Sequence, residues 1–412
     1  MRSGLFRGYR APLMTWAGAT LAVLAIAHMS NEVLRDGTWF GAGPDHYVDG
    51  LVQYDGHRYL EIAADGYSYR PGVQSTIVWF PAYPLVIRAV STILATPMLA
   101  AVLVTITMAG IALLLYGNWL ALHESTGRSR LVALLALALS PYAWFLYGTV
   151  YADAMFLALA LGALLLVHRG RDLLGGVLGG LALATRPTAI VLVPTLAALA
   201  AVRHGALGQK VGRWDATSST TGPRRWALRL AAWLQLPEWL DRTKLKRSLR
   251  APAIALLGLV AYAGYLWGAF GNPLIFLSNQ RTFHDGRYPL LKGTFFSRML
   301  HFSETPAHSL TLLLQALLTA AVLLTAGRVA RRFGFPYAVL VVGTVAVTFL
   351  GTHDFMGAGR YMLAAFPAFA VWGERLVELT EGREALQVIG VMTSGVAMLV
   401  MAFFFSRGVY LS

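Results

Sequence analysis

Uninterrupted apolar runs of about twenty residues constrain this chain more than any other feature, because an α-helix needs that length to cross the hydrocarbon core of a bilayer. The segments 251–270 and 386–405 contain no charged residue. A transmembrane β-barrel would instead show short segments of alternating polarity. Since 57% of the residues are hydrophobic and only 13% are charged, we predict an all-α polytopic membrane protein.

The formal net charge of +14 would suggest a nucleic-acid partner in a soluble protein. Here the basic residues gather in loops between the apolar runs, a pattern typical of topology determinants and of contacts with anionic lipids. We therefore expect membrane lipids as partners, and no nucleic acid. The chain has no cysteine, which excludes disulfides, thiolate metal sites and a cysteine nucleophile.

The N-terminus is predicted to lie in the cytoplasm, because Arg2, Arg7 and Arg10 precede the first apolar run at 11–29. The triplet at 25–27, Ala-Ile-Ala, is a weak match to a signal-peptidase site. A cleaved leader is thus the alternative. The run exceeds an ordinary leader core and further spans follow, so an uncleaved first helix is preferred.

This orientation makes the region 31–96 a large first extracytoplasmic loop, in which acidic residues outnumber basic ones over 31–76. The apolar stretch 77–94 could span the membrane or lie along its interface. We favour an interfacial or re-entrant helix, because Arg128 and Arg130 then fall in the cytoplasm, as the positive-inside rule requires.

Further spans are expected at 97–122, 131–147, 154–167, 251–270, 309–326, 336–350, 361–371 with its continuation, and 386–405. The segment 147–153 is predicted to be a short outside turn. Proline at position 187 removes a helix hydrogen bond and disfavours helical geometry at Arg186. The segment 173–202 is therefore predicted to be a hairpin of two half-length helices, open to the cytoplasm.

The region 203–250 is predicted to be the main cytoplasmic loop, with eleven Lys and Arg residues against three acidic ones. Within it, the segment 226–240 is typical of a basic amphipathic helix on the membrane surface, and a solvated linker is the alternative. The chain 1–412 is then a single transmembrane domain.

Four polar, aromatic-rich segments fall on the extracytoplasmic face in this topology, and we expect them to share one cleft. A carboxylate near a bilayer is costly and is usually kept for a task, which makes Asp55 the candidate catalytic residue. The other polar residues are His57 and Arg58 in the first segment, Asp153 in the second, Gln280, Arg281 and His284 in the third, and His353 and Arg360 in the fourth.

Arginine holds phosphate through forked, charge-assisted hydrogen bonds, so Arg58, Arg281 and Arg360 are candidates for binding an anionic lipid head group. The alternative is pairing with a nearby carboxylate such as Asp285 or Asp354. The histidines and aspartates here do not have the spacing of a zinc motif, so no metal or other cofactor is expected.

At these residues the chain resembles the GT-C superfamily of polytopic glycosyltransferases, and within it the mannosyltransferases of the PIG-V type. The resemblance covers most of the chain and depends on the order and spacing of its motifs. The matching segments are the loop around Asp55, 80–85, 181–188, 270–276, and 359–362 with 366–367.

The resemblance implies a GT-C-type bundle of about 10 to 12 transmembrane helices, each near the twenty residues that a span requires. It also implies a polyprenyl-phosphate sugar donor, most naturally of mannose, and a lipid-linked glycan acceptor. Asp55 matches the family's first-loop aspartate. Tyr54 stands where the family commonly has Trp, and Ala152-Asp153 where it has Ser-Glu, so a carboxylate is kept at position 153.

The reaction implied is one inverting displacement with Asp55 as the base. Arg360, followed by Tyr361 in the matching motif, is the first choice for stabilising the departing phosphate. Arg186 could share this task only if the hairpin break reaches the cleft. Two alternatives stay open: a secondary transporter, which a broken helix also suits, and a GT-C enzyme of different sugar or acceptor specificity. Alanine- and arginine-rich usage suggests a bacterial plasma membrane.

Overall fold

The computed structural model describes residues 7–33, 49–123, 127–208, 223–237, 239–282, 292–304, 306–409 and 411. Within these ranges the regular structure is helical except for β1 (Leu207–Gly208) and β2 (Trp239–Leu240), which pair antiparallel. Five helices in the same ranges are long and apolar enough to cross a membrane, and five further apolar helices are shorter. The predicted all-α polytopic membrane fold is confirmed.

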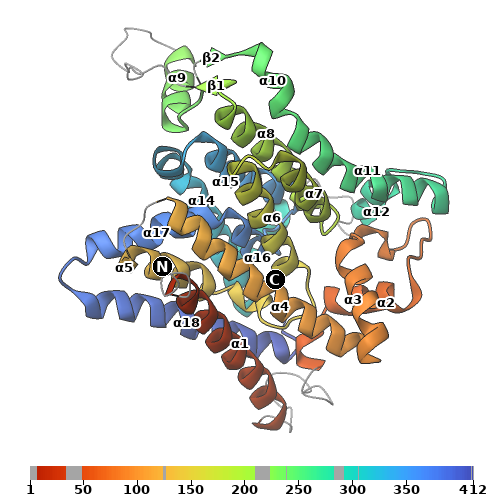
Figure 1. Ribbon diagram of the computed structural model, residues 1–412. Coiled ribbons are helices and arrows are strands. Elements are labelled where there is room, and N and C mark those ends of the chain that lie inside the picture. Colours follow the sequence, from red (N-terminus) through yellow and green to blue (C-terminus); the bar gives the residue numbers. More distant parts are fainter. Residues whose placement is uncertain are drawn as a thin grey trace.

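Figure 1 shows the order and arrangement of the helices. The α-helices are α1 (Arg7–Val33), α2 (Asp55–Asp65), α3 (Ala82–Leu94), α4 (Pro97–Leu122), α5 (Gly127–Ala138), α6 (Asp153–His168), α7 (Asp172–Leu183), α8 (Leu192–Arg203), α9 (Pro223–Trp233), α10 (Arg242–Ser248), α11 (Arg250–Phe270), α12 (Ile275–Thr282), α13 (Gly293–Leu300), α14 (Pro306–Phe333), α15 (Phe335–Gly351), α16 (Ala358–Tyr361), α17 (Phe366–Leu379) and α18 (Glu384–Ser406). Short 3₁₀-helices are η1 (Asp49–Leu51), η2 (Thr76–Val78), η3 (Ala143–Leu146), η4 (Pro187–Val191) and η6 (Met362–Ala365).

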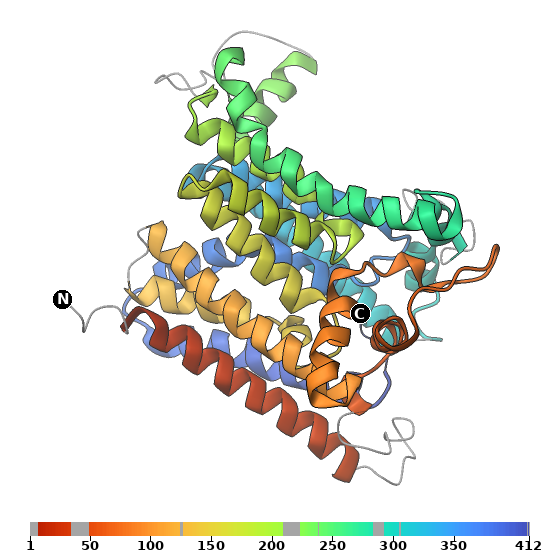
Figure 2. The ribbon, with the colours of Figure 1, turned by 45° about the vertical axis from the view of Figure 1, so that its right-hand side comes forward.

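The long apolar helices α1, α4, α11, α14 and α18 follow the predicted runs, and α4 has the predicted bounds. Figure 2 shows α1 in red, α4 in orange and α11 in green with similarly inclined axes, and α4 runs in the opposite chain direction to α1. The region 31–96 contains α2 and α3. Since α3 has 13 residues, it is about 20 Å long, which is shorter than the ~30 Å hydrocarbon core. Its interfacial position stays a prediction.

The segment 173–202 is broken where the sequence predicts. α7 ends before the break, η4 begins at Pro187, and Arg186 has an extended backbone with φ −165° and ψ 152°. At the other end of the two helices, Arg203 Nη2 lies 2.7 Å from Asp172 Oδ2. The start of α7 and the end of α8 therefore lie together, and the predicted hairpin shape is confirmed.

The segment 131–147, predicted to be a span, is not one continuous helix, and its crossing of the membrane stays a prediction. α5 ends at Ala138, well before the end of the apolar run. The reason is Pro141, which cannot donate a helix hydrogen bond and disfavours helical geometry at Ser140. The helix therefore stops within the protein, and the chain continues as turns and the short η3.

The segment 147–153 forms a turn as predicted, but this turn is buried inside the protein, and its side of the membrane stays a prediction. Tyr147 and Tyr151 have no exposed surface. The backbone stays paired without a regular helix: Val150 donates its N–H to Leu51 O at 3.0 Å, as a buried amide must. This contact places η1 and the start of α2 beside the start of α6.

The helix predicted at 226–240 is shorter than expected. α9 ends at Trp233, and Gln235 has a left-handed φ of 51°. Leu236 donates its N–H back to Ala231 O at 2.9 Å, a closure that ends helices. The chain then turns into β2, and α9 packs at the same end of the molecule as β1 (Figure 1).

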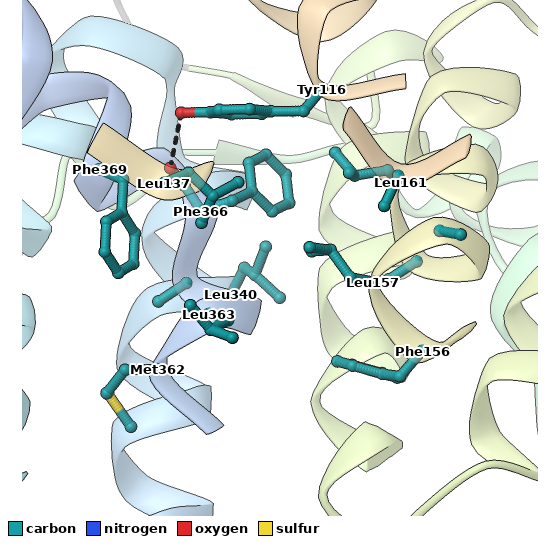
Figure 3. Close-up of a cluster of buried hydrophobic side chains, with 14 of the residues drawn as sticks. Tyr116, Leu137, Phe156, Leu157, Leu161, Leu340, Met362, Leu363, Phe366 and Phe369 are labelled. Carbon is teal, nitrogen blue, oxygen red and sulfur yellow. Dashed lines mark hydrogen bonds between the residues drawn. The ribbon is translucent and has the colours of Figure 1, made fainter. Parts of the chain in front are cut away.

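The core lies where α4, α5, α6, α15 and the η6–α17 segment meet. Figure 3 shows Leu157 and Leu161 of α6 pointing toward Leu363 and Phe366. Tyr116 of α4 is fully buried, and its hydroxyl donates to Phe366 O at 3.3 Å, which satisfies a group that is costly to bury unpaired. This packing fixes η6 and therefore the short α16 that precedes it.

Candidate active site

Four charged side chains from distant parts of the chain meet in one cluster. Arg360 Nη2 lies 2.8 Å from Asp55 Oδ2, and its Nη1 lies 3.8 Å from Asp153 Oδ2. Arg186 Nη2 lies 2.8 Å from the same Asp153 oxygen. Buried charges are tolerated when they are paired. Two carboxylates and two guanidinium groups make this cluster neutral overall.

Each member of the cluster stands where a helix begins or breaks. Asp55 and Asp153 are the first residues of α2 and α6, where the helix dipole favours a negative charge. Arg186 precedes η4 at the hairpin break, and Arg360 lies in the four-residue α16. The backbone at helix ends thus directs these side chains toward one point.

Two strained residues flank acidic residues of the site. Tyr54, before Asp55, has φ 52°, and Phe355, after Asp354, has φ 68°. A non-glycine residue in this region costs roughly 1–3 kcal/mol. The Tyr54 hydroxyl donates to Gly408 O, which ties the turn before α2 to the end of α18. Such strain persists where surrounding contacts hold it, and here they fix the start of α2.

A cavity of about 550 Å³ opens onto the cluster. Its walls come from α2, the segment 78–80, the hairpin break, α12, the end of α15 and α16. The Asp55 side chain is 26% exposed, whereas the Asp153 side chain is only 2% exposed. A substrate can therefore reach Asp55, while Asp153 lies behind the arginines.

The Arg360 guanidinium is buried against aromatic rings. Its Cζ lies 4.8 Å from the ring centre of Tyr151 and 4.9 Å from that of Tyr361. Burial alone would lower the pKa of Arg360, but Tyr361, Asp55 and Asp153 raise it well above its usual value. Within the described part of the chain, Nε of Arg360 and Nε of Arg186 have no hydrogen-bond partner. Each arginine therefore keeps one N–H donor that is buried and unpaired in the described structure.

Lys292 holds the loop that forms one wall of the cavity. Its Nζ donates to Phe349 O and Thr352 O. Burial lowers the pKa of Lys292 to about 8, against an opposing effect of Asp354. Asp354 is buried, and its Oδ2 lies 3.5 Å from Nδ1 of His353. The amine therefore fixes the backbone on which His353 and Asp354 stand.

The structure brings most of the predicted site residues together. The cavity wall includes Asp55, Gln280, His353, Arg360 and Tyr361. The Tyr361 hydroxyl accepts a hydrogen bond from Arg360 Nη2 at 3.3 Å. Asp153 lies directly behind this wall.

Other predicted residues lie elsewhere. His57 and Arg58 are on the exposed face of α2, away from the cavity wall, and Arg58 Nη1 lies 2.8 Å from Glu61 Oε2. The predictions for the Arg281 side chain and for His284 fall outside the described residues. Arg58 thus has the carboxylate partner that was the alternative to phosphate binding, though a different one from those expected.

Three further residues belong to the site. The hairpin break does reach the cavity, so the condition set for Arg186 is met. Tyr59 lines the cavity one helical turn after Asp55, and the i, i+4 spacing on α2 could have indicated it. No sequence pattern indicated Lys292, because its carbonyl partners lie at the end of α15, 57 and 60 residues away.

An apolar groove of about 580 Å³ lies beside the cavity, between α3, α7 and α11. The two share chain segments: Phe80 and Thr185 line the cavity, while Pro81 and Ala184 line the groove. A hydrogen bond of 2.8 Å from Ala82 N to Ala184 O joins the two segments. A ligand with a polar head and an apolar chain could therefore occupy both.

The positive charge that the described residues offer to a substrate comes from guanidinium groups. Among the residues that the structure describes, no three His, Cys, Asp or Glu side chains come together in a way that could hold a metal ion. Arg186 and Arg360 carry the positive charge at the cavity.

No known family model and no curated protein sequence matches the chain. One similar solved structure is the Archaeoglobus fulgidus oligosaccharyltransferase in complex with zinc and sulfate, with 14% identity, a TM-score of 0.47, and coverage of 95% of this chain and 53% of that one. Another is the oligosaccharyltransferase AglB of the same organism with an inhibitory peptide and a dolichol-phosphate, with 14% identity, a TM-score of 0.40, and coverage of 94% and 55%. The chain spans about half the length of these proteins.

Proposed function

We propose that this chain is an integral membrane glycosyltransferase. It transfers a sugar, with mannose as the first choice, from a polyprenyl-phosphate donor to a lipid-linked glycan on the extracytoplasmic face. The observation that carries the proposal is a solvent-accessible carboxylate, Asp55, paired with the buried Arg360 in a cavity beside an apolar groove. The sequence resemblance to PIG-V-type GT-C enzymes supports the same reading.

Asp55 acts as the general base. Its carboxylate takes the proton of the acceptor hydroxyl while that oxygen bonds to the anomeric carbon of the donor sugar. The bond from this carbon to the lipid phosphate oxygen breaks, and the phosphate leaves with the electron pair. A single displacement inverts the anomeric configuration. The exposure of the Asp55 side chain on the cavity permits the contact that this step needs.

Arg360 and Arg186 stabilise the departing phosphate. Both line the cavity, and each has a buried Nε with no partner in the described residues. Preorganised donors aimed at developing charge are worth most where water is excluded. Because Arg360 also pairs with Asp55, a bound phosphate competes with Asp55 for the guanidinium. The carboxylate is thus released as a base when the donor is in place.

The polyprenyl chain occupies the apolar groove. The groove begins at Pro81 and Ala184, each the chain neighbour of a residue that lines the cavity. Its far wall includes Tyr262 and Tyr265 of α11. Each buried CH₂ of the chain contributes about 0.8 kcal/mol, which supplies affinity for a lipid donor while the phosphate sets its position.

The activity test uses membranes that carry the full-length protein, a labelled mannosyl-phosphoryl-polyprenol donor, and the endogenous lipids as acceptors. Asp55→Asn is expected to lower transfer by at least about a hundredfold, the scale of lost general-base catalysis. Asp65→Asn, an exposed carboxylate on the same helix, is the matched control and should retain transfer. Full activity of Asp55→Asn removes this residue from the mechanism.

Sidedness is tested by cysteine labelling, since the chain has no cysteine of its own. His57 and Arg328 are both exposed, and they lie near opposite ends of the bundle. A membrane-impermeant maleimide added to intact cells should label His57→Cys and should reach Arg328→Cys only after permeabilisation. Labelling in the reverse order would place Asp55 on the cytosolic side and end the proposal.

A further inference from the structure

A second polar pocket lies one helix length away from the catalytic cluster. α6 begins at Asp153 and ends at His168, and its 16 residues span about 23 Å. A pocket of about 550 Å³ lies at this far end of α6. Its wall is formed there by the ends of four other helices, namely α4, α8, α14 and α15. We call it the far pocket. The proposed function does not use it.

The far pocket has a basic wall. Its members among the described residues that can carry a positive charge are His123, His168, Arg203 and Arg331, and no carboxylate lines it. Arg203 is already held by Asp172 at 2.7 Å. Arg331 is exposed, and no ion pair to it occurs in the described part of the chain. A concave wall of one sign concentrates ions of the opposite sign, so this pocket suits an anion.

The roof of the far pocket is an amphipathic element. Gln235 and Pro237, which follow α9, line the pocket. α9 is anchored by Trp233: a Cβ added at Gly327 of α14 would come within 2.1 Å of the indole Nε1. The Trp233 indole therefore packs directly against the backbone of α14 at Gly327, where any larger residue would clash with it.

The elements α9 and β2, which flank Gln235 and Pro237 in the chain and which we call the rim, expose apolar side chains. Trp226 and Leu230 on α9 are 63% and 42% exposed, and Trp239 and Leu240 of β2 are also exposed. Tryptophan and leucine beside basic residues are typical of an element that lies in a membrane interface. The rim thus favours an anion that arrives attached to a lipid.

We propose that the far pocket binds a phosphate-bearing anion, namely the head group of an anionic phospholipid. The phosphate lies between Arg331 and His168 and accepts their hydrogen bonds. The acyl chains lie along Trp226 and Leu230. This lipid is distinct from the sugar donor, because the two sites are at opposite ends of α6.

The test is native mass spectrometry of the purified full-length protein titrated with phosphatidylglycerol or phosphatidylcholine. Arg331→Gln and His168→Gln are the test variants. The matched control is Arg328→Gln, an exposed arginine on the same helix that is outside the pocket wall. Loss of one charge-assisted hydrogen bond should weaken phosphatidylglycerol binding about tenfold in Arg331→Gln. Arg328→Gln should bind like the unmodified protein.

A second arm uses inorganic phosphate, read out as a rise in melting temperature without added lipid. Binding in either arm that Arg331→Gln or His168→Gln weakens and Arg328→Gln keeps supports the proposal. The lipid arm or the phosphate arm then identifies the source of the anion. Equal weakening by Arg331→Gln and Arg328→Gln, equal binding of both lipids, or no binding in either arm overturns it. Sugar transfer is not the readout, so failure here is separate from failure of the proposed function.

Discussion

Arg360 Nη2 lies 2.8 Å from Asp55 Oδ2, although 305 residues separate the two in sequence. The contact joins α2, near the start of the chain, to α16 near its end. A guanidinium that holds the proposed base also faces the cavity where the donor phosphate is proposed to lie. Donor binding and release of the base are therefore coupled through one side chain.

This coupling predicts a specific kinetic effect at Arg360. Arg360→Lys keeps the charge but loses the forked geometry, and Arg360→Ala loses both. The apparent KM for the polyprenyl-phosphate donor should rise by about tenfold in Arg360→Lys, the loss expected for one charge-assisted hydrogen bond, and further in Arg360→Ala. Initial rates against donor concentration measure this. Arg58→Ala, on the exposed face of α2, is the control, and an unchanged donor KM in both Arg360 variants refutes the phosphate role.

Asp153 should contribute to stability more than any surface carboxylate. Its side chain is 2% exposed and lies 2.8 Å from Arg186 and 3.8 Å from Arg360. Asp153→Asn leaves these buried cations short of a partner, which typically costs about 3–5 kcal/mol. Glu378→Gln breaks an exposed pair with Arg375 and should cost at most about 1 kcal/mol. Thermal unfolding of the solubilised variants measures both, and equal midpoints contradict the prediction.

The sequence predicted what depends on local pattern. Apolar runs gave the long helices, and the Arg186-Pro187 pair gave the break in the hairpin, because span length and proline geometry are local properties. Asp55 and Arg360 were predicted to face one cleft, and the structure places them in contact. Hydropathy combined with charge thus located the two ends of this ion pair.

What depends on tertiary contacts could not be predicted. Pro141 breaks the predicted span 131–147, and only packing shows that the residues after the break are buried inside the protein. Arg58 and Arg360 were both predicted to bind phosphate from extracytoplasmic polar segments. Arg58 pairs with Glu61 on the surface, whereas Arg360 is buried and pairs with Asp55. The far pocket depends on helix ends from five parts of the chain, which no single window contains.

Packing of α7 against α11 gives a prediction about glycine. A Cβ added at Gly258 would come within 1.9 Å of Gly180 O, so the two helices touch backbone to backbone, whereas a Cβ at Gly264, on the same helix α11, would have nothing within 4 Å. Small residues permit such close contact between membrane helices.

Gly258→Ala must push the helices apart and should cost about 1–3 kcal/mol or more. Gly264→Ala should be neutral or gain up to about 1 kcal/mol from helix propensity. Because Gly180 and Gly258 also line the apolar groove, Gly258→Ala should weaken use of a long-chain donor more than use of a short-chain one. Melting temperatures and donor KM values for two chain lengths measure these effects. If Gly258→Ala has the same melting temperature as Gly264→Ala, α7 and α11 do not make this contact. If Gly258→Ala lowers the melting temperature but leaves the ratio of the donor KM values for long and short chains unchanged, the groove does not hold the polyprenyl chain.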